Sequence, residues 1–424
     1  MEKSRRYASL LKMIERNGFQ KYRLQQILDN MYKAKITSVN KMKNVPTNIR
    51  REMKKIFSEN LLSIKPLKEY KFDRAYKVLF ECKDKEKIEA TCLDFGSHKS
   101  LCISSQIGCS FACKFCATGQ IGIKRQLELD EITDQLLYFQ SQNEHVRNVS
   151  FMGMGEPLAN PHVFESIHFF NNVNLFSLSS RRINISTVGL LPGIKKLNDL
   201  FPQVNLSFSL HSPFSEERDK LVPINKLFPF HEVLHLLDNR ISQTGRRVWI
   251  SYILLKDVND SKDHAEALCN HIDQRPRAVR YLYNVCLIPY NKAKNVDENF
   301  HRVDEEDRIL QFEKVLRKHG ISFFYRFKMA RMNSFGLSID AACGQLYAGN
   351  VIRLEHPPFC ALQCPNGNQE GSPKTRKDAS LRLTLHTWSI FRRLRAQNEE
   401  RINRSSECAI TGTINYILLF FCED

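Results

Sequence analysis

The amino-acid sequence predicts an α/β protein in which a small basic helical N-terminal domain precedes a partial (β/α)6 barrel. Two observations support this prediction: the alternation of strand and helix patterns from residue 101 onward, and the basic helical pattern of residues 1–60. From residue 101 onward, six short β-rich runs alternate with amphipathic stretches of helical length. Such alternation builds a parallel sheet with right-handed crossovers. Six units are too few for a closed eightfold barrel, so we expect an open barrel whose active face lies at the carboxyl ends of the strands.

The basic domain is predicted over residues 1–60, which hold 15 Lys and Arg against 5 Asp and Glu. Its apolar residues recur at helical spacing, which indicates helices with basic outer faces. These residues are Leu10, Leu11, Ile14, Leu24, Ile27, Leu28 and Met31. A basic helical module of this kind suits contact with an RNA backbone, so we expect an accessory RNA-binding domain.

The rest of the chain divides into a strand-rich connector (61–100), the barrel core (101–350) and an atypical C-terminal extension (351–424). The connector should hold strands at 76–82 and 87–93. Strands of the core are expected at 101–105, 148–152, 182–187, 204–210, 248–254 and 284–288. Helices are expected between them at 130–142, 161–172, 192–200, 231–241 and 262–272, followed by a helix at 306–318 and a strand at 321–326. The extension shows no pattern of a packed domain and is expected to be poorly ordered. Its Cys360 and Cys364 are interpreted as incidental, because two thiols do not complete a zinc site.

Composition narrows the class of protein. A net charge of +17 favours a polyanionic partner, most simply nucleic acid, although a generally basic surface would also explain it. Thirteen cysteines without a secretory signal indicate reduced thiols in the cytoplasm rather than a disulfide framework. The longest apolar stretch, residues 414–422, is too short for a bilayer span, so no membrane partner is expected.

The most specific motif is Cys109-Ser-Phe-Ala-Cys113-Lys-Phe-Cys116. A [4Fe–4S] cluster normally takes four protein thiolates, so a three-thiolate loop leaves one iron open for another ligand. A zinc site is the alternative, but zinc would need a fourth Cys or His at paired spacing, and Cys102 is the nearest candidate.

This motif resembles the radical-SAM superfamily, and further runs resemble one branch, the Cfr and RlmN adenosine methyltransferases, with Cfr the closer of the two. The matching runs start at Cys102, Phe151, Ser209, Pro223 and Asp340. The resemblance implies a radical-SAM barrel, a [4Fe–4S] cluster on Cys109, Cys113 and Cys116, and S-adenosylmethionine (SAM) used twice per turnover. It also implies the SAM contacts, which are Gly155, Glu156, Ser186, Ser209, Leu210, His211 and Asn291. Without the resemblance, each of these would be interpreted as an ordinary polar residue or glycine at the end of a strand.

The resemblance also implies three catalytic residues. The Cys343 thiolate would take a methyl group from one SAM, and a second SAM would generate the radical that activates this methyl for addition to adenine. Cys102 would then resolve the protein–RNA adduct through a disulfide, and Glu89 would accept a proton. On the residues alone, Cys343 is a small buried thiol and Glu89 a strand carboxylate facing water.

The function implied is C8 methylation of a peptidyl-transferase-centre adenosine in 23S ribosomal RNA, with resistance to antibiotics that bind there. An alternative is RlmN-type C2 methylation of 23S ribosomal RNA and transfer RNA. A non-catalytic zinc-containing RNA-binding protein is a more distant one. We expect a monomer that takes electrons from a flavodoxin or ferredoxin.

Overall fold

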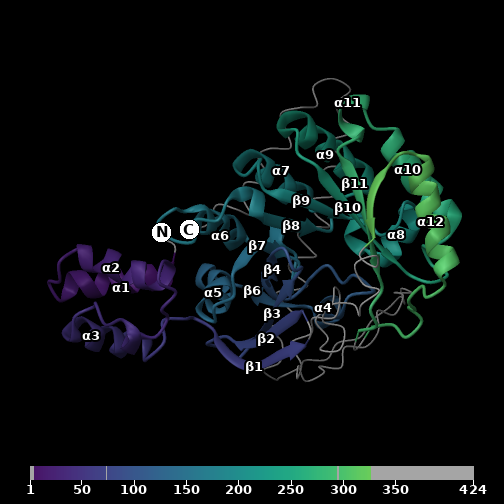
Figure 1. The fold of residues 1–424 in the computed structure, drawn as a ribbon. Coiled ribbons are helices and arrows are strands. Elements are labelled where there is room, and N and C mark those ends of the chain that lie inside the picture. The colour runs from purple at the N-terminus through teal and green to yellow at the C-terminus, as the bar shows by residue number, and fades with distance from the viewer. Residues whose placement is uncertain (1–3, 73, 294–295, 326–424) are drawn as a thin grey trace, which may run out of the picture. The chain divides into compact units, whose positions relative to one another are not determined.

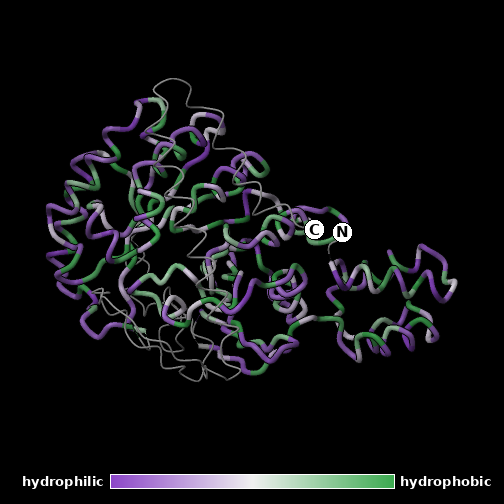
Figure 2. The backbone as a smooth tube through the Cα atoms, turned by 180° about the vertical axis from the view of Figure 1, so that it is seen from behind, coloured by the Kyte–Doolittle hydropathy of each residue, from purple (hydrophilic) through white to green (hydrophobic). Residues whose placement is uncertain are grey.

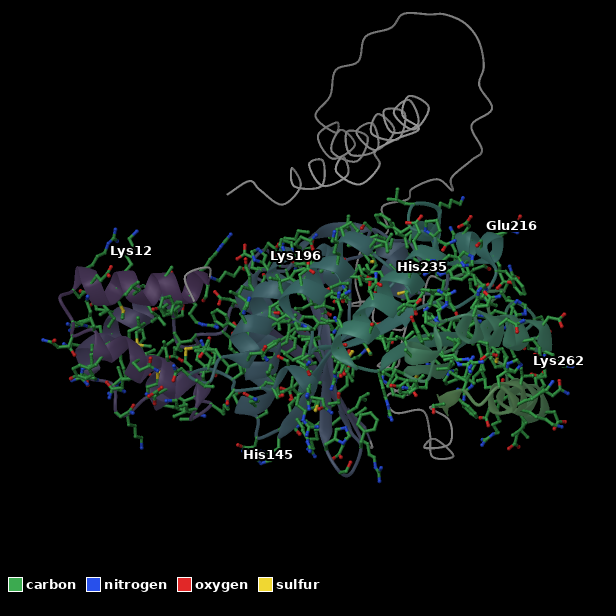
Figure 3. All side chains as sticks on the ribbon, turned by 90° about the horizontal axis from the view of Figure 1, so that it is seen from above. Lys12, His145, Lys196, Glu216, His235 and Lys262 are labelled. Carbon is green, nitrogen blue, oxygen red and sulfur yellow. The ribbon has the colours of Figure 1, made fainter. Side chains whose placement is uncertain are left out.

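The computed structural model describes residues 4–72, 74–293 and 296–325. Cys343 and the C-terminal extension lie outside these ranges. The N-terminal segment forms α1 (Arg5–Arg16), α2 (Tyr22–Tyr32), the short η1 (Val39–Lys41) and α3 (Thr47–Phe57). Figure 2 shows hydrophobic and hydrophilic residues interleaved along these helices, and Lys12 projects outward from α1 in Figure 3. The helices predicted for residues 1–60 are therefore present.

A ten-stranded sheet forms the centre of the molecule (Figure 1). Its spatial order is β1-β2-β3-β4-β7-β8-β9-β10-β11-β12. The first four are β1 (Lys65–Phe72), β2 (Ala75–Glu81), β3 (Lys87–Asp94) and β4 (Lys99–Cys102), which pair antiparallel. The others are β7 (Val146–Phe151), β8 (Ile183–Thr187), β9 (Asn205–Ser209), β10 (Val248–Leu254), β11 (Tyr283–Pro289) and β12 (Ser322–Tyr325). From β4 to β12 every pairing is parallel.

The helices after the first three connect or follow these strands. They are α4 (Ala117–Ile121), α5 (Leu129–Ser141), α6 (Pro161–Asn171), α7 (Leu191–Leu200), α8 (Ser215–Leu221), α9 (Phe230–Thr244), α10 (Lys262–Asp273), α11 (Arg277–Arg280) and α12 (Glu306–Lys318). Figure 1 shows α6, α7, α9 and α10 along the outer side of the curved sheet. Several begin where the sequence supplies a cap: Asn160 accepts from the His162 N–H, and Glu128 and Glu131 form a capping box on α5. None of the described helices is long and apolar enough to cross a bilayer.

Two features differ from the sequence prediction. The sheet is larger than the six expected core strands, because β1 to β3, from residues 61–100, extend it beyond β4. A small antiparallel hairpin of β5 (Gln106–Gly108) and β6 (Ile123–Gln126) also brackets the cysteine loop. Both β1 and this hairpin are rich in charged or polar residues, so they lack the apolar alternation that marks a strand.

The two faces of the sheet differ in chemistry. Residues facing the helices are apolar and buried, for example Val149 and Phe151 of β7 and Ile183 and Ile185 of β8. The alternate residues form what we call the inner face, which is mostly polar. Its members, placed on one side by the strand register, are Cys102, Ser150, Asn184, Ser186, Asn205, Ser207, Ser209, Trp249 and Ser251. A packed barrel interior would be filled by branched aliphatic side chains, so this face suits a polar ligand.

Candidate active site

The cysteine loop lies between β5 and α4. Backbone hydrogen bonds shape it: the Cys109 N–H donates to the Gly122 carbonyl at 3.0 Å, and the Cys116 N–H donates to the Cys113 carbonyl at 3.2 Å. The Lys114 N–H donates to the Leu221 carbonyl at 3.0 Å, which ties the loop to the end of α8. The loop is therefore held at its start by the Gly122 carbonyl and in its middle by the end of α8.

The three thiols are close enough to interact electrostatically. Burial raises the pKa of Cys109 to about 12, with a further rise from Cys116, and burial raises the pKa of Cys113 well above its ordinary value. A bound metal cation would instead favour the deprotonated thiolates, because the thiolate is the form that ligates metal. Among the described residues, no three Cys, His, Asp or Glu side chains converge tightly enough to hold one metal ion. In a [4Fe–4S] cluster each thiolate would bind a different iron, so three cysteines in one loop would leave the fourth iron open. The donor set thus fits the expected [4Fe–4S] group.

The turn after β7 places Gly155 and Glu156 beside the cysteine loop. Gly155 has φ +99°, and a Cβ there would lie 2.5 Å from the Gln106 side chain, so only glycine fits. The Glu156 N–H donates to Gln106 Oε1 at 2.7 Å. The Glu156 carboxylate accepts from the Val188 N–H at 3.0 Å and the Leu158 N–H at 3.2 Å.

Glu156 is fully buried, and this burial raises its pKa to about 7 despite those hydrogen bonds. A cation placed beside it would favour the ionised form. The ammonium of a methionine moiety is a cation of the right size. This carboxylate is therefore suited to hold the amino end of SAM.

Ser209, Leu210 and His211 follow one another at the carboxyl end of β9. Ser209 Oγ lies 3.4 Å from Ser186 Oγ, at the end of β8. His211 has φ +62°, and its Nδ1 accepts from the Ile253 N–H at 3.0 Å. Burial and the nearby Arg218 lower the His211 pKa to about 3, so its ring is neutral with the proton on Nε2. The ring lies edge-on to Phe115 of the cysteine loop, with centroids 4.8 Å apart.

Asn291 follows β11 and completes the edge. It is buried, its Nδ2 donates to the Pro289 carbonyl at 3.3 Å, and its Oδ1 has no hydrogen-bond partner among the described residues. A buried amide oxygen without a partner is costly, so a ligand donor there would be favourable. All seven expected SAM contacts thus occur at the carboxyl ends of β7, β8, β9 and β11.

Of the three expected catalytic residues, two are described. Cys102 ends β4, partly exposed, next to Ser150 of β7 in the strand register. Glu89 lies on β3, is buried and has Lys77 beside it at 3.4 Å. Cys343 lies outside the described residues.

The structure adds one site residue that the sequence did not single out, Arg218 of α8. Its fully buried guanidinium donates to three backbone carbonyls, those of Val188, Ser209 and Leu210, at 2.8 to 2.9 Å, and to Asn225 Oδ1 at 2.7 Å. These bonds join the ends of β8 and β9. No local pattern marks an arginine whose partners are backbone carbonyls of distant strands.

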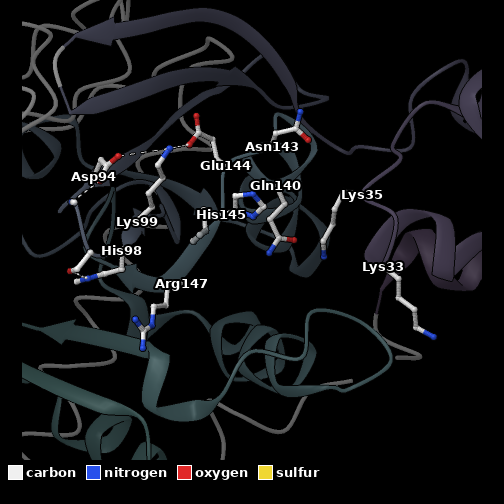
Figure 4. Close-up of a pocket in the computed structure, with 13 residues that line it drawn as sticks. Lys33, Lys35, Asp94, His98, Lys99, Gln140, Asn143, Glu144, His145 and Arg147 are labelled. Carbon is white, nitrogen blue, oxygen red and sulfur yellow. Dashed lines mark hydrogen bonds and ion pairs between the residues drawn. The ribbon is translucent and has the colours of Figure 1, made fainter.

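A second concave region lies at the opposite ends of the strands. It is a pocket of about 760 Å³ at the starts of β4 and β7, with Lys35, Lys99 and Arg147 among its lining residues (Figure 4). Lys99 is already paired with Glu144 and Asp94. Since the cysteine loop and Glu156 belong to the carboxyl ends, this pocket is separate from the candidate active site.

The three-thiolate loop, the glutamate-bearing turn and the open parallel barrel together define a radical SAM protein. The family model described as the Radical SAM superfamily matches residues 103–268. The crystal structure of a radical SAM methyltransferase from Sphaerobacter thermophilus superposes with a TM-score of 0.73 at 31% identity, covering 81% of this chain and 97% of that one.

Curated relatives are similar along most of the chain. The ribosomal RNA large subunit methyltransferase Cfr of Bacillus velezensis is 43% identical over 348 residues, which cover 82% of this chain and 97% of the relative. The protein of the same name from Staphylococcus aureus is 44% identical over 343 residues, 81% of this chain and 96% of the relative. The chain therefore belongs to this family, the Cfr-type radical SAM methyltransferases.

Proposed function

We propose that the chain methylates C8 of a peptidyl-transferase-centre adenosine in 23S ribosomal RNA and so confers resistance to antibiotics that bind there. The observation that supports the proposal is the mostly polar inner face, with Glu156, Ser209 and Asn291 at the carboxyl ends of β7, β9 and β11. The relatives named Cfr, alike over almost their full lengths, support the RNA substrate.

The chemistry of the target explains why such a site is needed. C8 and C2 of adenine are electron-poor carbons flanked by nitrogen, so neither attacks a sulfonium as a nucleophile would. A reduced [4Fe–4S] cluster supplies the electron for homolytic cleavage of SAM, which opens a radical route instead. In the proposal Cys109, Cys113 and Cys116 hold that cluster. Glu156 holds the SAM ammonium, while Ser186, Ser209, Leu210, His211 and Asn291 surround the rest of the molecule.

Cys343 would carry the methyl group as S-methylcysteine, after taking it from a first SAM by polar displacement. A radical from the second SAM would remove a hydrogen atom from this methyl group, and the resulting carbon radical would add to the adenine ring. The adduct would then give up its unpaired electron to the oxidised cluster held by the three loop cysteines, and Glu89 would accept the proton from the ring carbon. The Cys102 thiolate would then attack the Cys343 sulfur. A disulfide forms, the sulfur–carbon bond breaks, and its electron pair stays with the released base, which gains a proton to complete the methyl group.

Recognition of the RNA would combine two parts of the molecule. The basic helices α1 to α3 would contact the phosphate backbone, and the target base would be unstacked to reach the inner face. We further propose a monomer that receives electrons from a flavodoxin or ferredoxin.

The nucleoside product tests the proposal. The chain is expressed in a bacterial strain that lacks its own adenine-C2 methyltransferase, and the adenosines of 23S ribosomal RNA and transfer RNA are analysed by mass spectrometry against synthetic standards. We expect 8-methyladenosine in 23S ribosomal RNA and raised resistance to antibiotics of the peptidyl-transferase centre. 2-Methyladenosine would instead identify the RlmN-type activity.

The cysteine roles are tested in a reconstituted assay. We expect Cys343→Ala to abolish methylation and Cys102→Ala to accumulate protein covalently linked to RNA, because the adduct forms but is not resolved. Turnover by Cys343→Ala would contradict the S-methylcysteine route. Iron and sulfide analysis of anaerobically purified protein is the companion measurement, since a zinc protein would contain neither.

A further inference from the structure

A buried ion pair lies next to Cys102 on the sheet. Lys77 Nζ of β2 is 3.4 Å from Glu89 Oε1 of β3, and each side chain is only 6% exposed. Burying two charges is expensive, and a well-packed apolar pair would stabilise the fold as well or better. The opposite face of β2 and β3 is packed with apolar residues instead, and Val78 and Ala90 are fully buried there. A stabilising role therefore does not explain why this pair is charged.

The strand register places the pair in line with the site. Lys77 is opposite Thr91, Thr91 is opposite Cys102, and Cys102 is opposite Ser150, so all four lie on the same side of the sheet. Glu89 precedes Thr91 by two residues and shares that side. Diagonal neighbours on adjacent strands are about 7 Å apart, which puts the Glu89 carboxylate within reach of a group bonded near Cys102.

The surroundings of Lys77 fix its ammonium group. The Tyr70 ring lies 5.2 Å from Nζ, on the side of β1, while Glu89 lies on the side of β3. Between this pair and Cys102, the hydroxyl of Thr91 is buried without a hydrogen-bond partner among the described residues. The row from Tyr70 to Cys102 thus contains, at Thr91, a buried hydroxyl without a hydrogen-bond partner among the described residues, and a ligand could supply that partner.

We propose that Lys77 is a positioning residue for proton transfer: it keeps the Glu89 carboxylate ionised and aimed at the covalently held adenine. The proposal rests on the proposed function, which assigns proton acceptance to Glu89. In that step the proton leaves the ring carbon, the C–H electron pair stays with the base, and the carboxylate becomes a carboxylic acid. Only the ionised carboxylate can do this, and a buried carboxylate without a cation favours its neutral form.

The test compares Lys77→Met, which keeps the chain length without the charge, with Lys77→Arg, which keeps a cation. The control is Lys71→Met, which removes an exposed lysine from the neighbouring strand, where it lies over the Tyr76 ring. Each full-length holoenzyme is assayed for RNA methylation, Cys343 methylation by peptide mass spectrometry, SAM cleavage and RNA-linked protein.

We expect Lys77→Met to lower RNA methylation roughly 100-fold, the low end of what a general base contributes, while Cys343 methylation and SAM cleavage continue and RNA-linked protein accumulates. Lys77→Arg should restore most of the rate, and the control should match the parent. Unchanged turnover in Lys77→Met, or parallel loss of Cys343 methylation without rescue by arginine, would overturn the proposal. The Cys102→Ala variant distinguishes failure of the Lys77 proposal from failure of the proposed function. If this variant forms no covalent adduct with RNA, the proposed function itself fails.

Discussion

Gly155 shows how one residue can control the ligand site. Its φ of +99° is unfavourable for any other residue, and the missing side chain leaves the space that the Gln106 amide occupies. Gln106 in turn accepts from the Glu156 N–H, so the position of the carboxylate depends on this contact. The glycine, the amide and the carboxylate therefore act as one unit.

We predict that Gly155→Ala weakens SAM binding by at least about tenfold, since the displaced Gln106 loses a charge-positioning hydrogen bond of about 1.5 kcal/mol. Anaerobic titration calorimetry on cluster-loaded protein measures the dissociation constant. Gly245→Ala is the matched control, because Gly245 also has a positive φ (+61°) but an added methyl group there would meet no other atom within 4 Å. Equal losses in both variants would show that backbone strain alone is responsible.

At the scale of elements, apolar periodicity predicted the parallel strands and their helices well. The six expected core strands correspond to β4, β7, β8, β9, β10 and β11. The polar inner face was not predicted, because Ser and Asn in a strand look like turn formers unless the register is known. Arg218 was missed for a similar reason: its partners are carbonyls of β8 and β9, which only the fold brings together.

A second prediction concerns the packing of α10 against α12. His319, directly after α12, hydrogen bonds through Nδ1 to Asp273 (2.6 Å) and through Nε2 to Glu266 (3.0 Å), both on α10. The Asp273 bond, followed by Glu266, raises the His319 pKa above its ordinary 6.5. Cys269, also on α10, lies close to these acids, and burial raises its pKa to about 12.

A histidine whose pKa is raised by folding stabilises the protein below its unfolded pKa, and this contribution is lost as the pH rises through the folded value. We therefore expect the free energy of unfolding to decline above about pH 6.5 by about 0.5 to 1 kcal/mol, the range for a partly exposed ion pair. Urea unfolding between pH 5.5 and 8.5 measures it. His319→Gln should remove this decline, whereas His145→Gln, exposed just before β7, should not change it. A decline that persists in His319→Gln would contradict the assignment.

At the scale of the whole molecule, a buried polar network attaches the basic helical segment to the barrel. Arg6 of α1 donates to both carboxylate oxygens of Asp134 on α5, at 2.6 and 2.7 Å, and to the Tyr32 hydroxyl of α2 at 2.8 Å. Its backbone N–H donates to Asp130 at 2.8 Å. The network therefore links the segment expected to contact RNA with the helix that precedes β7.

We predict that Arg6→Met destabilises the protein by about 3 to 5 kcal/mol, because it leaves the carboxylates of Asp134 and Asp130 buried without their cation. Replacing the arginine together with one acid, Arg6→Met with Asp134→Leu, should recover much of that loss, since the pair is then exchanged for apolar contacts.

If the attachment also orients the basic helices, the double variant should retain stability but bind RNA with a smaller salt dependence, because fewer phosphates are neutralised at once. Denaturant unfolding and RNA titrations at several salt concentrations measure the two effects separately. An unchanged salt slope in a stable double variant would show that the network stabilises the fold without orienting the RNA-binding surface.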